Sequence, residues 1–259
     1  MSGFLAWPLA AMTELVVGSF VGAVAYRLPR GISVVWPPSA CPECTMRLRS
    51  RDLVPVVSFL ATRGRCRYCS LRIPLRYPLT ELATGGLFVA SSLLSTDWLS
   101  FTVGAAFFSL LVLMFIIDLE HMLLPNAINV AGIALGLSAA ALGWTGLSAQ
   151  EALFGAALGY GLIYVVVLAS RGGMGMGDAK FLALIGSFVG PQGVIVTLFG
   201  ASLVGTVVGI SLIGLGRHER RQPMPFGPYL AGVAVVVWIS LHNQGLKSLV
   251  PSVIAGWSS

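Results

Sequence analysis

The sequence predicts an all-α polytopic membrane protein with about eight transmembrane helices and one small cytoplasmic loop domain. Hydrophobic residues make up 56% of the chain and charged residues only 10%, whereas about a quarter of a typical soluble domain is charged. Apolar segments long enough to form transmembrane helices recur along the chain. One polar stretch separates the first of these segments from the rest, and it contains all four cysteines.

The first apolar segment covers residues 3–26 and contains one acid, Glu14. No basic region precedes it and the stop-like sequence YRLPR follows it, so we expect a retained helix rather than a cleaved signal peptide. A polar stretch rich in Arg and Pro follows at 27–77, and 78–259 form a domain of seven further helices. The segment at 179–190 is shorter than the roughly 20 residues that a span needs, so we expect its flanks to extend it. The seven expected helices cover about 79–96, 99–117, 126–144, 151–169, 179–190, 193–215 and 228–243.

The basic residues predict the orientation of these helices. Ten of the sixteen lie between Arg27 and Arg76, and all ten are arginines. If the amino terminus is outside, fifteen of the sixteen fall on the cytoplasmic side and only Lys247 lies outside, in keeping with the positive-inside rule. We therefore expect both termini outside. An Arg-rich segment can also bind nucleic acid, but the positive-inside rule already accounts for this one, so no nucleic-acid partner is expected.

The four cysteines form a Cys-x2-Cys-x21-Cys-x2-Cys pattern within CPEC and CRYC. Two such paired knuckles suit a tetrahedral Zn²⁺ ion with four thiolate ligands. We expect a structural ion, because four thiolates leave no open position for water and because about fifty residues of loop hold too little apolar surface for a core. The sequence therefore predicts a zinc-knuckle loop domain at 27–77. The expected ligands are Cys41, Cys44, Cys66 and Cys69.

Two of the ten acidic residues stand out because of the apolar runs beside them. Asp118 ends the run LLVLMFIID, and Asp178 follows the glycine run GGMGMG and precedes an apolar helix. In the expected topology both lie at the cytoplasmic face, although they are sixty positions apart. A carboxylate in or near lipid is costly, so it marks a candidate functional site. Five other acids lie in or near predicted loops and are interpreted as solvated surface charges: Glu43, Asp52, Asp97, Glu151 and Glu219.

Two neighbouring carboxyl groups of this kind support two different activities. They share a proton, since both cannot easily be ionised, and such a pair can activate a water and protonate a peptide carbonyl. The same pair can also form the proton or cation relay of a transporter, and the residues alone favour this commoner class. A third alternative is a zinc-ribbon binding protein anchored in the membrane. The sequence lacks the dinucleotide-binding, zincin and serine-hydrolase motifs.

In its motifs the chain resembles the bacterial type IV prepilin peptidases, which are membrane aspartic proteases with a Gly-x-Gly-Asp motif. The segment GMGMGDAKFLALIGSFVG is similar to that family's second-aspartate motif, and IDLEHMLLPN is similar to its first. The amino-terminal half matches in GSF, YRLP, the two Cys pairs and RYPLTEL, and FGP at 226–228 fits the last span. The resemblance covers nearly the whole chain and reverses the preference for a transporter.

The resemblance implies an enzyme that cuts the short basic leader from prepilins and pseudopilins at the cytoplasmic face of the bacterial inner membrane. It implies that Asp118 and Asp178 are the catalytic pair, and that Gly175 and Gly177 shape the second site and leave room for substrate. Many members then methylate the new amino terminus with S-adenosylmethionine, an activity associated with the zinc-knuckle loop. Members of the family serve type IV pili or type II secretion.

The sequence departs from the family pattern at two positions in the half linked to methylation. Gly22 stands where the family has Asn after GSF, and Leu53 replaces the Asn of a DNIP motif. The basic loop also differs from what a basic leader requires, because like charges repel. We therefore expect the loop to contact anionic membrane lipids, and the substrate to be selected by its apolar helix.

Overall fold

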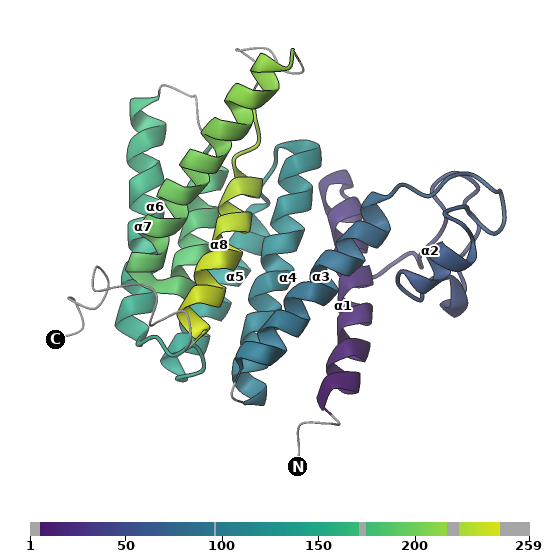
Figure 1. Cartoon of the computed structure of the whole chain (residues 1–259), viewed down its shortest axis with the longest axis horizontal. Coiled ribbons are helices and arrows are strands. Elements are labelled where there is room, and N and C mark those ends of the chain that lie inside the picture. The colour runs from purple at the N-terminus through teal and green to yellow at the C-terminus, as the bar shows by residue number, and fades with distance from the viewer. Residues whose placement is uncertain (1–5, 96, 171–174, 217–222, 244–259) are drawn as a thin grey trace. The chain divides into compact units, whose positions relative to one another are not determined.

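The computed structural model describes residues 6–95, 97–170, 175–216 and 223–243, without the side chains of 6–16. The chain divides into two compact units, Met1–Leu93 and Leu94–Ser259. Helices make up all the regular structure of the described residues, apart from two isolated β-bridges (Figure 1). The all-α prediction is therefore confirmed for the part of the chain that the structure describes.

The first unit contains two long helices, α1 at Ala6–Arg27 and α3 at Arg76–Leu94. The segment between them holds three short helices: η1 at Leu28–Arg30, η2 at Ser50–Asp52 and α2 at Val57–Ala61. The Val56 N–H donates a hydrogen bond of 2.7 Å to Glu81 Oε2, which ties this irregular segment to α3. The loop domain predicted from the cysteine spacing is thus anchored to a helix of its own unit.

Asp52 holds the irregular segment together. Its carboxylate accepts hydrogen bonds from Arg67 Nε at 2.9 Å, the Tyr68 hydroxyl at 2.8 Å and the Arg49 backbone N–H at 3.1 Å. Burial opposes its ionisation, but the three hydrogen bonds outweigh that effect and lower the pKa of Asp52. The interpretation of Asp52 as a solvated surface charge is wrong, because its side chain is only 8% exposed.

Glu151 also has a structural role rather than the purely solvated one that was expected. It lies in the first turn of α6, and its Oε2 accepts hydrogen bonds from the Ser148 backbone N–H and hydroxyl at 2.8 and 2.7 Å. Ser148 Oγ in turn accepts from the Glu151 N–H, which completes a capping box. The carboxylate therefore fixes where this helix begins.

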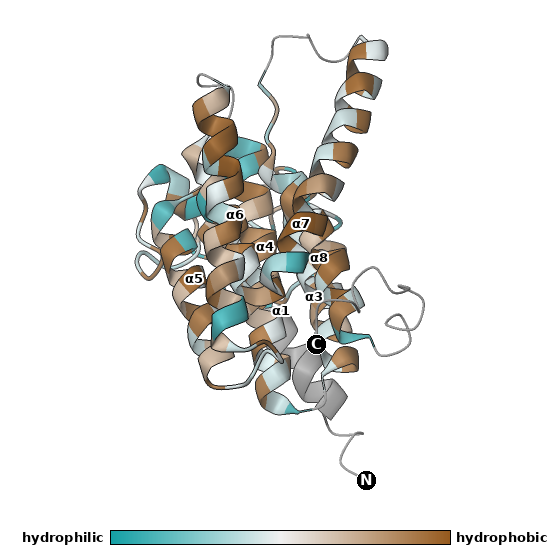
Figure 2. Cartoon of the chain, turned by 90° about the vertical axis from the view of Figure 1, so that its left-hand side faces the viewer, coloured by the Kyte–Doolittle hydropathy of each residue, from teal (hydrophilic) through white to brown (hydrophobic). Residues whose placement is uncertain are grey.

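The described residues of the second unit form five helices, and their apolar residues run along most of their length (Figure 2). Among the described residues, α4, α6 and α7 are long and apolar enough to cross a membrane, whereas α5 and α8 are shorter apolar helices. The helices are α4 at Trp98–His121, α5 at Asn126–Ala141, α6 at Ala149–Ala169, α7 at Met176–Gly214 and α8 at Gly227–His242.

The segments predicted at 179–190 and 193–215 are two halves of the single element α7. The short segment is extended as expected, because α7 begins at Met176. The two halves are not separated by a loop. Gly190 adopts φ 70° and ψ −178°, a conformation suited to glycine, and Pro191 has no N–H to continue the helical ladder. The chain therefore changes direction at Gly190 without leaving helical structure on either side.

Aromatic packing joins three helices of the second unit. The rings of Phe107 in α4 and Phe188 in α7 stack with their centroids 4.5 Å apart. Phe108 in α4 meets Trp238 in α8 edge to face, with centroids 4.9 Å apart. All four side chains are buried. Such pairs contribute about 0.5–1.5 kcal/mol each beyond the burial of their area, so they join α4, α7 and α8 about three helical turns away from the acids.

Candidate active site

Asp118 lies near the carboxyl end of α4 and is almost completely buried, with 4% of its surface exposed. The backbone N–H of Gly227, the first residue of α8, donates a hydrogen bond of 2.8 Å to Asp118 Oδ2. The first N–H of α8, which has no acceptor within its own helix, therefore points at the carboxyl group. This contact joins residues 109 positions apart and fixes one oxygen of the acid.

Gly227 is a site residue that reasoning from the sequence missed. A Cβ added there would lie 2.7 Å from Asp118 Oδ2, closer than real Cβ contacts. Only glycine lets the backbone approach the carboxyl group this closely. The segment FGP was noticed as fitting the last span, but nothing in the sequence indicated that its glycine meets Asp118.

Asp178 lies in the first turn of α7 and is partly exposed. Its backbone N–H bonds to the Gly175 carbonyl at 3.2 Å. The charge of Asp118 acts electrostatically on Asp178, so the two predicted acids are neighbours in the structure. Leu124, three residues beyond the end of α4, packs against the start of α7 at Gly177 and brings the two helix ends together.

The two predicted glycines occupy different environments. At Gly177 an added Cβ would lie 3.0 Å from Leu124 Cβ, so this glycine is needed for packing of the protein itself. Gly175 is exposed and extended, and an added Cβ there would lie 3.7 Å from Asp178 Oδ2, an ordinary contact. Only Gly175 therefore leaves open space directly beside the acid.

Lys180 and Asn126 connect the same end of the unit to α5. The Lys180 Nζ donates a hydrogen bond of 2.7 Å to Asn126 Oδ1. Asn126 begins α5 and closes the LLPN sequence that follows Asp118, whereas Lys180 follows Asp178 by two residues. The bond therefore links the two acid-bearing motifs through their flanking residues.

The four cysteines converge in the first unit. Their sulphur atoms all lie within 4.8 Å of one another, and Cys41 Sγ and Cys69 Sγ are 4.0 Å apart. The two knuckles repeat the same backbone pattern: Cys41 N–H bonds to the Met46 carbonyl at 3.0 Å, and Cys66 N–H bonds to the Leu71 carbonyl at 2.8 Å. The two Cys pairs therefore form turns of the same kind, and the four sulphur atoms of these turns converge.

This cluster fits a tetrahedral zinc ion. Zn–S bonds of about 2.3 Å place the sulphur atoms of a tetrahedral site about 3.8 Å apart, close to the separations found. Burial raises the pKa of Cys66, but hydrogen bonds from the Tyr68 and Cys69 backbone N–H groups and from neighbouring thiols lower it to about 7. A backbone hydrogen bond from Leu71 lowers the pKa of Cys69, but burial and the neighbouring thiols raise it to about 12. One thiol of the cluster therefore ionises first, and a metal would bind the cysteines as thiolates. The structure therefore shows four cysteines placed where they could bind a metal ion.

Comparison with known sequences assigns both halves of the chain. Residues 12–94 match the sequence model of the bacterial peptidase A24 N-terminal domain, and residues 105–210 match that of the type IV leader peptidase family. The chain belongs to the type IV leader peptidase family. The boundary between the two matched regions of this family member coincides, to within about ten residues, with the boundary between the two compact units.

Three relatives of this leader peptidase family member share one name. The prepilin leader peptidase/N-methyltransferase of Bacillus subtilis is 34% identical over 87% of this chain and 90% of its own. The proteins of that name from Pseudomonas aeruginosa (36% identical, 88% of this chain and 87% of the relative) and Aeromonas hydrophila (34%, 92% and 91%) are similar to it as well. No solved structure matches. Neither the family models nor these relatives support a transporter.

The positions that depart from the family pattern both lie in the first unit. Gly22 is in α1, and an added Cβ there would have no atom within 4 Å. Leu53 caps η2 next to Asp52 and is 39% exposed. Both positions therefore have room for the larger or more polar side chain that the family pattern carries, so neither departure is forced by packing.

Proposed function

We infer that this chain removes the leader peptide from prepilins and pseudopilins at the cytoplasmic face of the membrane, and then methylates the new amino terminus. The family and the relatives' names support both activities. The observation that carries the peptidase assignment is the pairing of Asp118 with Asp178 at adjoining helix ends. Two carboxyl groups beside an exposed glycine are what an aspartic protease needs to reach a peptide backbone.

In the proposed mechanism Asp118 and Asp178 hold one proton between them. The ionised carboxylate removes a proton from a water molecule as that water attacks the scissile carbonyl carbon. The protonated carboxyl donates its proton to the carbonyl oxygen, so the developing negative charge is neutralised. Breakdown of the tetrahedral intermediate returns a proton to the leaving amine and releases the leader. The Gly227 N–H holds Asp118 in place throughout these steps.

Gly175 provides the access that this reaction requires. The substrate is an apolar helix near the cut, and it must become extended locally before a carboxylate can reach its backbone. Gly175 is exposed beside Asp178, with no side chain to block an extended segment. Gly177 contributes differently, because it lets Leu124 pack against α7 and so keeps the two acids near each other.

Methylation is assigned to the amino-terminal half with the zinc-knuckle loop at 27–77. S-adenosylmethionine would supply the methyl group to the free amine. Cys41, Cys44, Cys66 and Cys69 would hold one structural Zn²⁺ ion, and the metal would stabilise the fold of a segment with a small core. The bond between Val56 and Glu81 supports a link between this loop and α3, where the RYPLTEL sequence lies.

The protein is proposed to reside in the bacterial inner membrane with eight spans and both termini outside. Three described helices are long enough to cross the bilayer, and the two halves of α7 supply the sixth and seventh proposed spans. Arginines and exposed apolar side chains such as Val35 and Trp36 suit contact of the 27–77 loop with anionic lipid headgroups. Lys247 and the carboxyl terminus lie outside the described residues. A reporter fused after Ser259 should be active only in an extracytoplasmic assay.

Mass spectrometry of a prepilin incubated with the purified enzyme tests both activities. Loss of a leader-sized fragment reports the peptidase, and addition of one methyl mass to the mature product reports the methyltransferase. The second product should require S-adenosylmethionine, whereas the first should not. An unchanged prepilin would contradict the proposal, and a cut but unmethylated product would restrict it to the peptidase.

A further inference from the structure

Glu81 is an acid of the first unit to which neither proposed activity yet assigns a role. It lies in the second turn of α3, within the RYPLTEL sequence, and its side chain is half-buried. Its Oε2 accepts the Val56 N–H at 2.7 Å, and among the described residues this is its one hydrogen bond. The other carboxylate oxygen, Oε1, is therefore available to a group that binds from outside the chain.

The unit around Glu81 is strongly basic, yet the described residues give this acid no cation partner. Ten arginines lie between Arg27 and Arg76, against four acids in the whole unit. Asp52, another of those acids, pairs with Arg67 at 2.9 Å, whereas none of the described basic side chains forms an ion pair with Glu81. A half-buried carboxylate is costly without a positive partner, so this one suits a cation that arrives with the substrate.

The backbone at Val56 is strained in the conformation that points its N–H at Glu81. The Val57 N–H bonds to the Pro55 carbonyl and closes a three-residue turn around Val56. Val56 has φ 57° and ψ −47°, and a β-branched residue rarely adopts a positive φ. Strain of this kind is found most often at functional sites, where the surrounding structure maintains it. The turn fixes one oxygen of the Glu81 carboxylate and so orients the other.

Two glycines of α1 shape the space beside Glu81. At Gly18 an added Cβ would lie 3.4 Å from the Glu81 Cα, so α1 packs closely against α3 at this point. Gly22 lies one turn further along the same face of α1, and an added Cβ there would have no atom within 4 Å. The helix continues from Gly22 towards the 27–77 segment. Open space therefore lies on the loop side of Glu81, where the end of another chain can approach the carboxylate.

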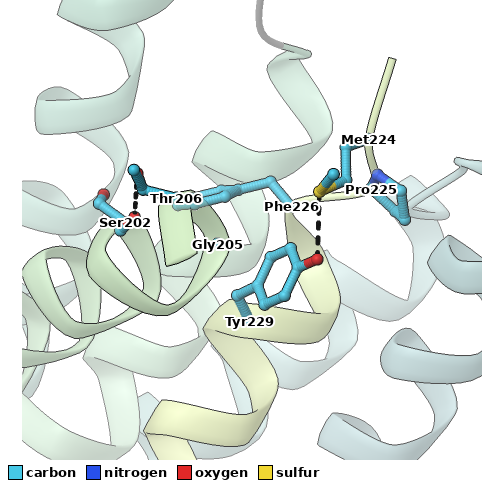
Figure 3. Close-up of a pocket in the computed structure, with 7 residues that line it drawn as sticks. All are labelled: Ser202, Gly205, Thr206, Met224, Pro225, Phe226 and Tyr229. Atoms are coloured by element: carbon cyan, nitrogen blue, oxygen red, sulfur yellow. Dashed lines mark hydrogen bonds between the residues drawn. The ribbon is translucent and has the colours of Figure 1, made fainter. Parts of the chain in front are cut away.

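The pocket between the second half of α7 and the start of α8 offers no comparable site for a cation (Figure 3). None of the described residues that line it carries a charge. Its polar side chains are already engaged, since the Tyr229 hydroxyl donates to Met224 Sδ at 3.1 Å and Thr206 Oγ1 donates to the Ser202 carbonyl at 2.7 Å. A positively charged group would therefore find no counter-ion there, in contrast to Glu81.

We propose that Glu81 binds the new amino terminus of the cleaved pilin and accepts a proton from it during methylation. The proposal rests on the methyltransferase activity inferred above. A free α-amino group is largely protonated at neutral pH, since its pKa is about 7.7–8.0, and the protonated amine has no lone pair. Transfer of one proton to Glu81 frees that lone pair. The nitrogen then forms a bond to the methyl carbon as the C–S bond of S-adenosylmethionine breaks, its electron pair stays on sulphur, and Glu81 releases the proton to water.

Two peptides with the sequence of a mature pilin amino terminus test this role in the full-length enzyme. One carries the free α-amino group, and the other lacks only that group. The affinity for both peptides is measured without S-adenosylmethionine, and methylation of the first gives kcat and KM. Glu81→Gln removes the charge but keeps an oxygen that can accept the Val56 N–H. Glu43→Gln, which changes an exposed acid of the same unit, is the matched control.

The wild-type enzyme should bind the free-amine peptide about 10-fold or more tightly than the peptide without the amine, because a charge-assisted hydrogen bond is lost. Glu81→Gln should bind the two peptides with affinities within about threefold of each other. It should also methylate about 100-fold more slowly, as expected when a general base is removed. Prepilin cleavage and the protease resistance of 27–77 should stay as in wild type. Glu43→Gln should match wild type in every measurement.

Three results would overturn the role of Glu81. Equal affinities of the wild-type enzyme for the two peptides would show that the amine is not recognised, whether or not the variant folds. A Glu81→Gln enzyme that keeps the preference and the methylation rate would place recognition elsewhere. Equal weakening of both peptides by Glu81→Gln would show a structural role only. A wild-type enzyme that binds the free-amine peptide but never methylates it would instead remove the methyltransferase activity on which the proposal rests.

Discussion

Two carboxylates, one in each unit, accept a backbone N–H at a similar distance but have different surroundings. Asp52 in the first unit accepts from Arg49 N–H at 3.1 Å and also from Arg67 and Tyr68. Asp118 in the second unit accepts from Gly227 N–H at 2.8 Å and has Asp178 as a charged neighbour. A carboxylate that meets cations and hydroxyls stabilises a fold. One that meets another acid is suited to catalysis, because the pair can exchange protons.

The two units also rely on different forces. The segment at 27–77 is held by polar bonds and brings four thiols together, and it leaves apolar side chains such as Val35 exposed. The second unit is stabilised by buried aromatic and aliphatic packing. The comparison teaches that cleavage and methylation should respond to different substitutions. Changes at the Asp118 end should affect cleavage, and changes in the polar segment should affect methylation.

The largest effect among the supporting residues is expected for Gly227→Ala. Its Cβ would collide with Asp118 Oδ2, so the carboxyl group must move and lose its backbone hydrogen bond. Displacement of a reacting group by about 1 Å costs roughly 100-fold in rate, and cleavage of a prepilin should fall by about that factor. Methylation of a pre-cut pilin should persist.

Gly232→Ala is the matched control for this substitution. It lies in the same helix, and an added Cβ there has no atom within 4 Å. Its cleavage rate should remain within about twofold of wild type, as for most surface changes. Equal rates for Gly227→Ala and wild type would show that Asp118 does not depend on this contact.

An intermediate effect is expected for Cys66→Ser. One Zn²⁺ ion per chain should be found in the purified wild-type protein, and the variant should retain much less metal because a thiolate ligand is lost. Methylation should fall by about 10-fold or more, while cleavage should change by less than about threefold. Elemental analysis and the two product masses measure these effects. A wild-type protein free of zinc would contradict the proposed metal site. Equal losses of both activities would contradict the assignment of methylation and cleavage to different units.

The smallest effect on prepilin cleavage is expected for Asp52→Asn. The neutral amide weakens the bonds to Arg67 and Tyr68, at a cost of about 1–3 kcal/mol. Protease cleavage within 27–77 should then be about 5- to 150-fold faster than in wild type, while prepilin cleavage is retained. Glu43→Gln changes an exposed acid of the same segment and should have no such effect. Equal rates of proteolysis for wild type and Asp52→Asn would show that the hydrogen bonds of Asp52 do not stabilise this segment.

Much of the site was predictable because unusual residues stand out against an apolar chain. Asp118 and Asp178 were found by their place beside apolar runs, and the cysteine pairs by their spacing. Gly227 was missed because its role is a backbone contact across 109 positions, which leaves no pattern in the sequence. The change of direction between the segments at 179–190 and 193–215 was predicted, but their direct junction at Gly190 and Pro191 was not, because the sequence there resembles an ordinary loop signal. The role of Asp52 depends on Arg67 and Tyr68, which only the folded segment brings near.

The central claim is that Asp118 and Asp178 act as one catalytic pair, and the most direct measurement is prepilin cleavage by Asp118→Asn and Asp178→Asn. Both variants should insert into the membrane like wild type, since each exchange keeps the size of the side chain. Each should lose nearly all cleavage, because residues that act as a unit are not additive, while methylation of a pre-cut pilin survives. Substantial cleavage by either variant would contradict the pair.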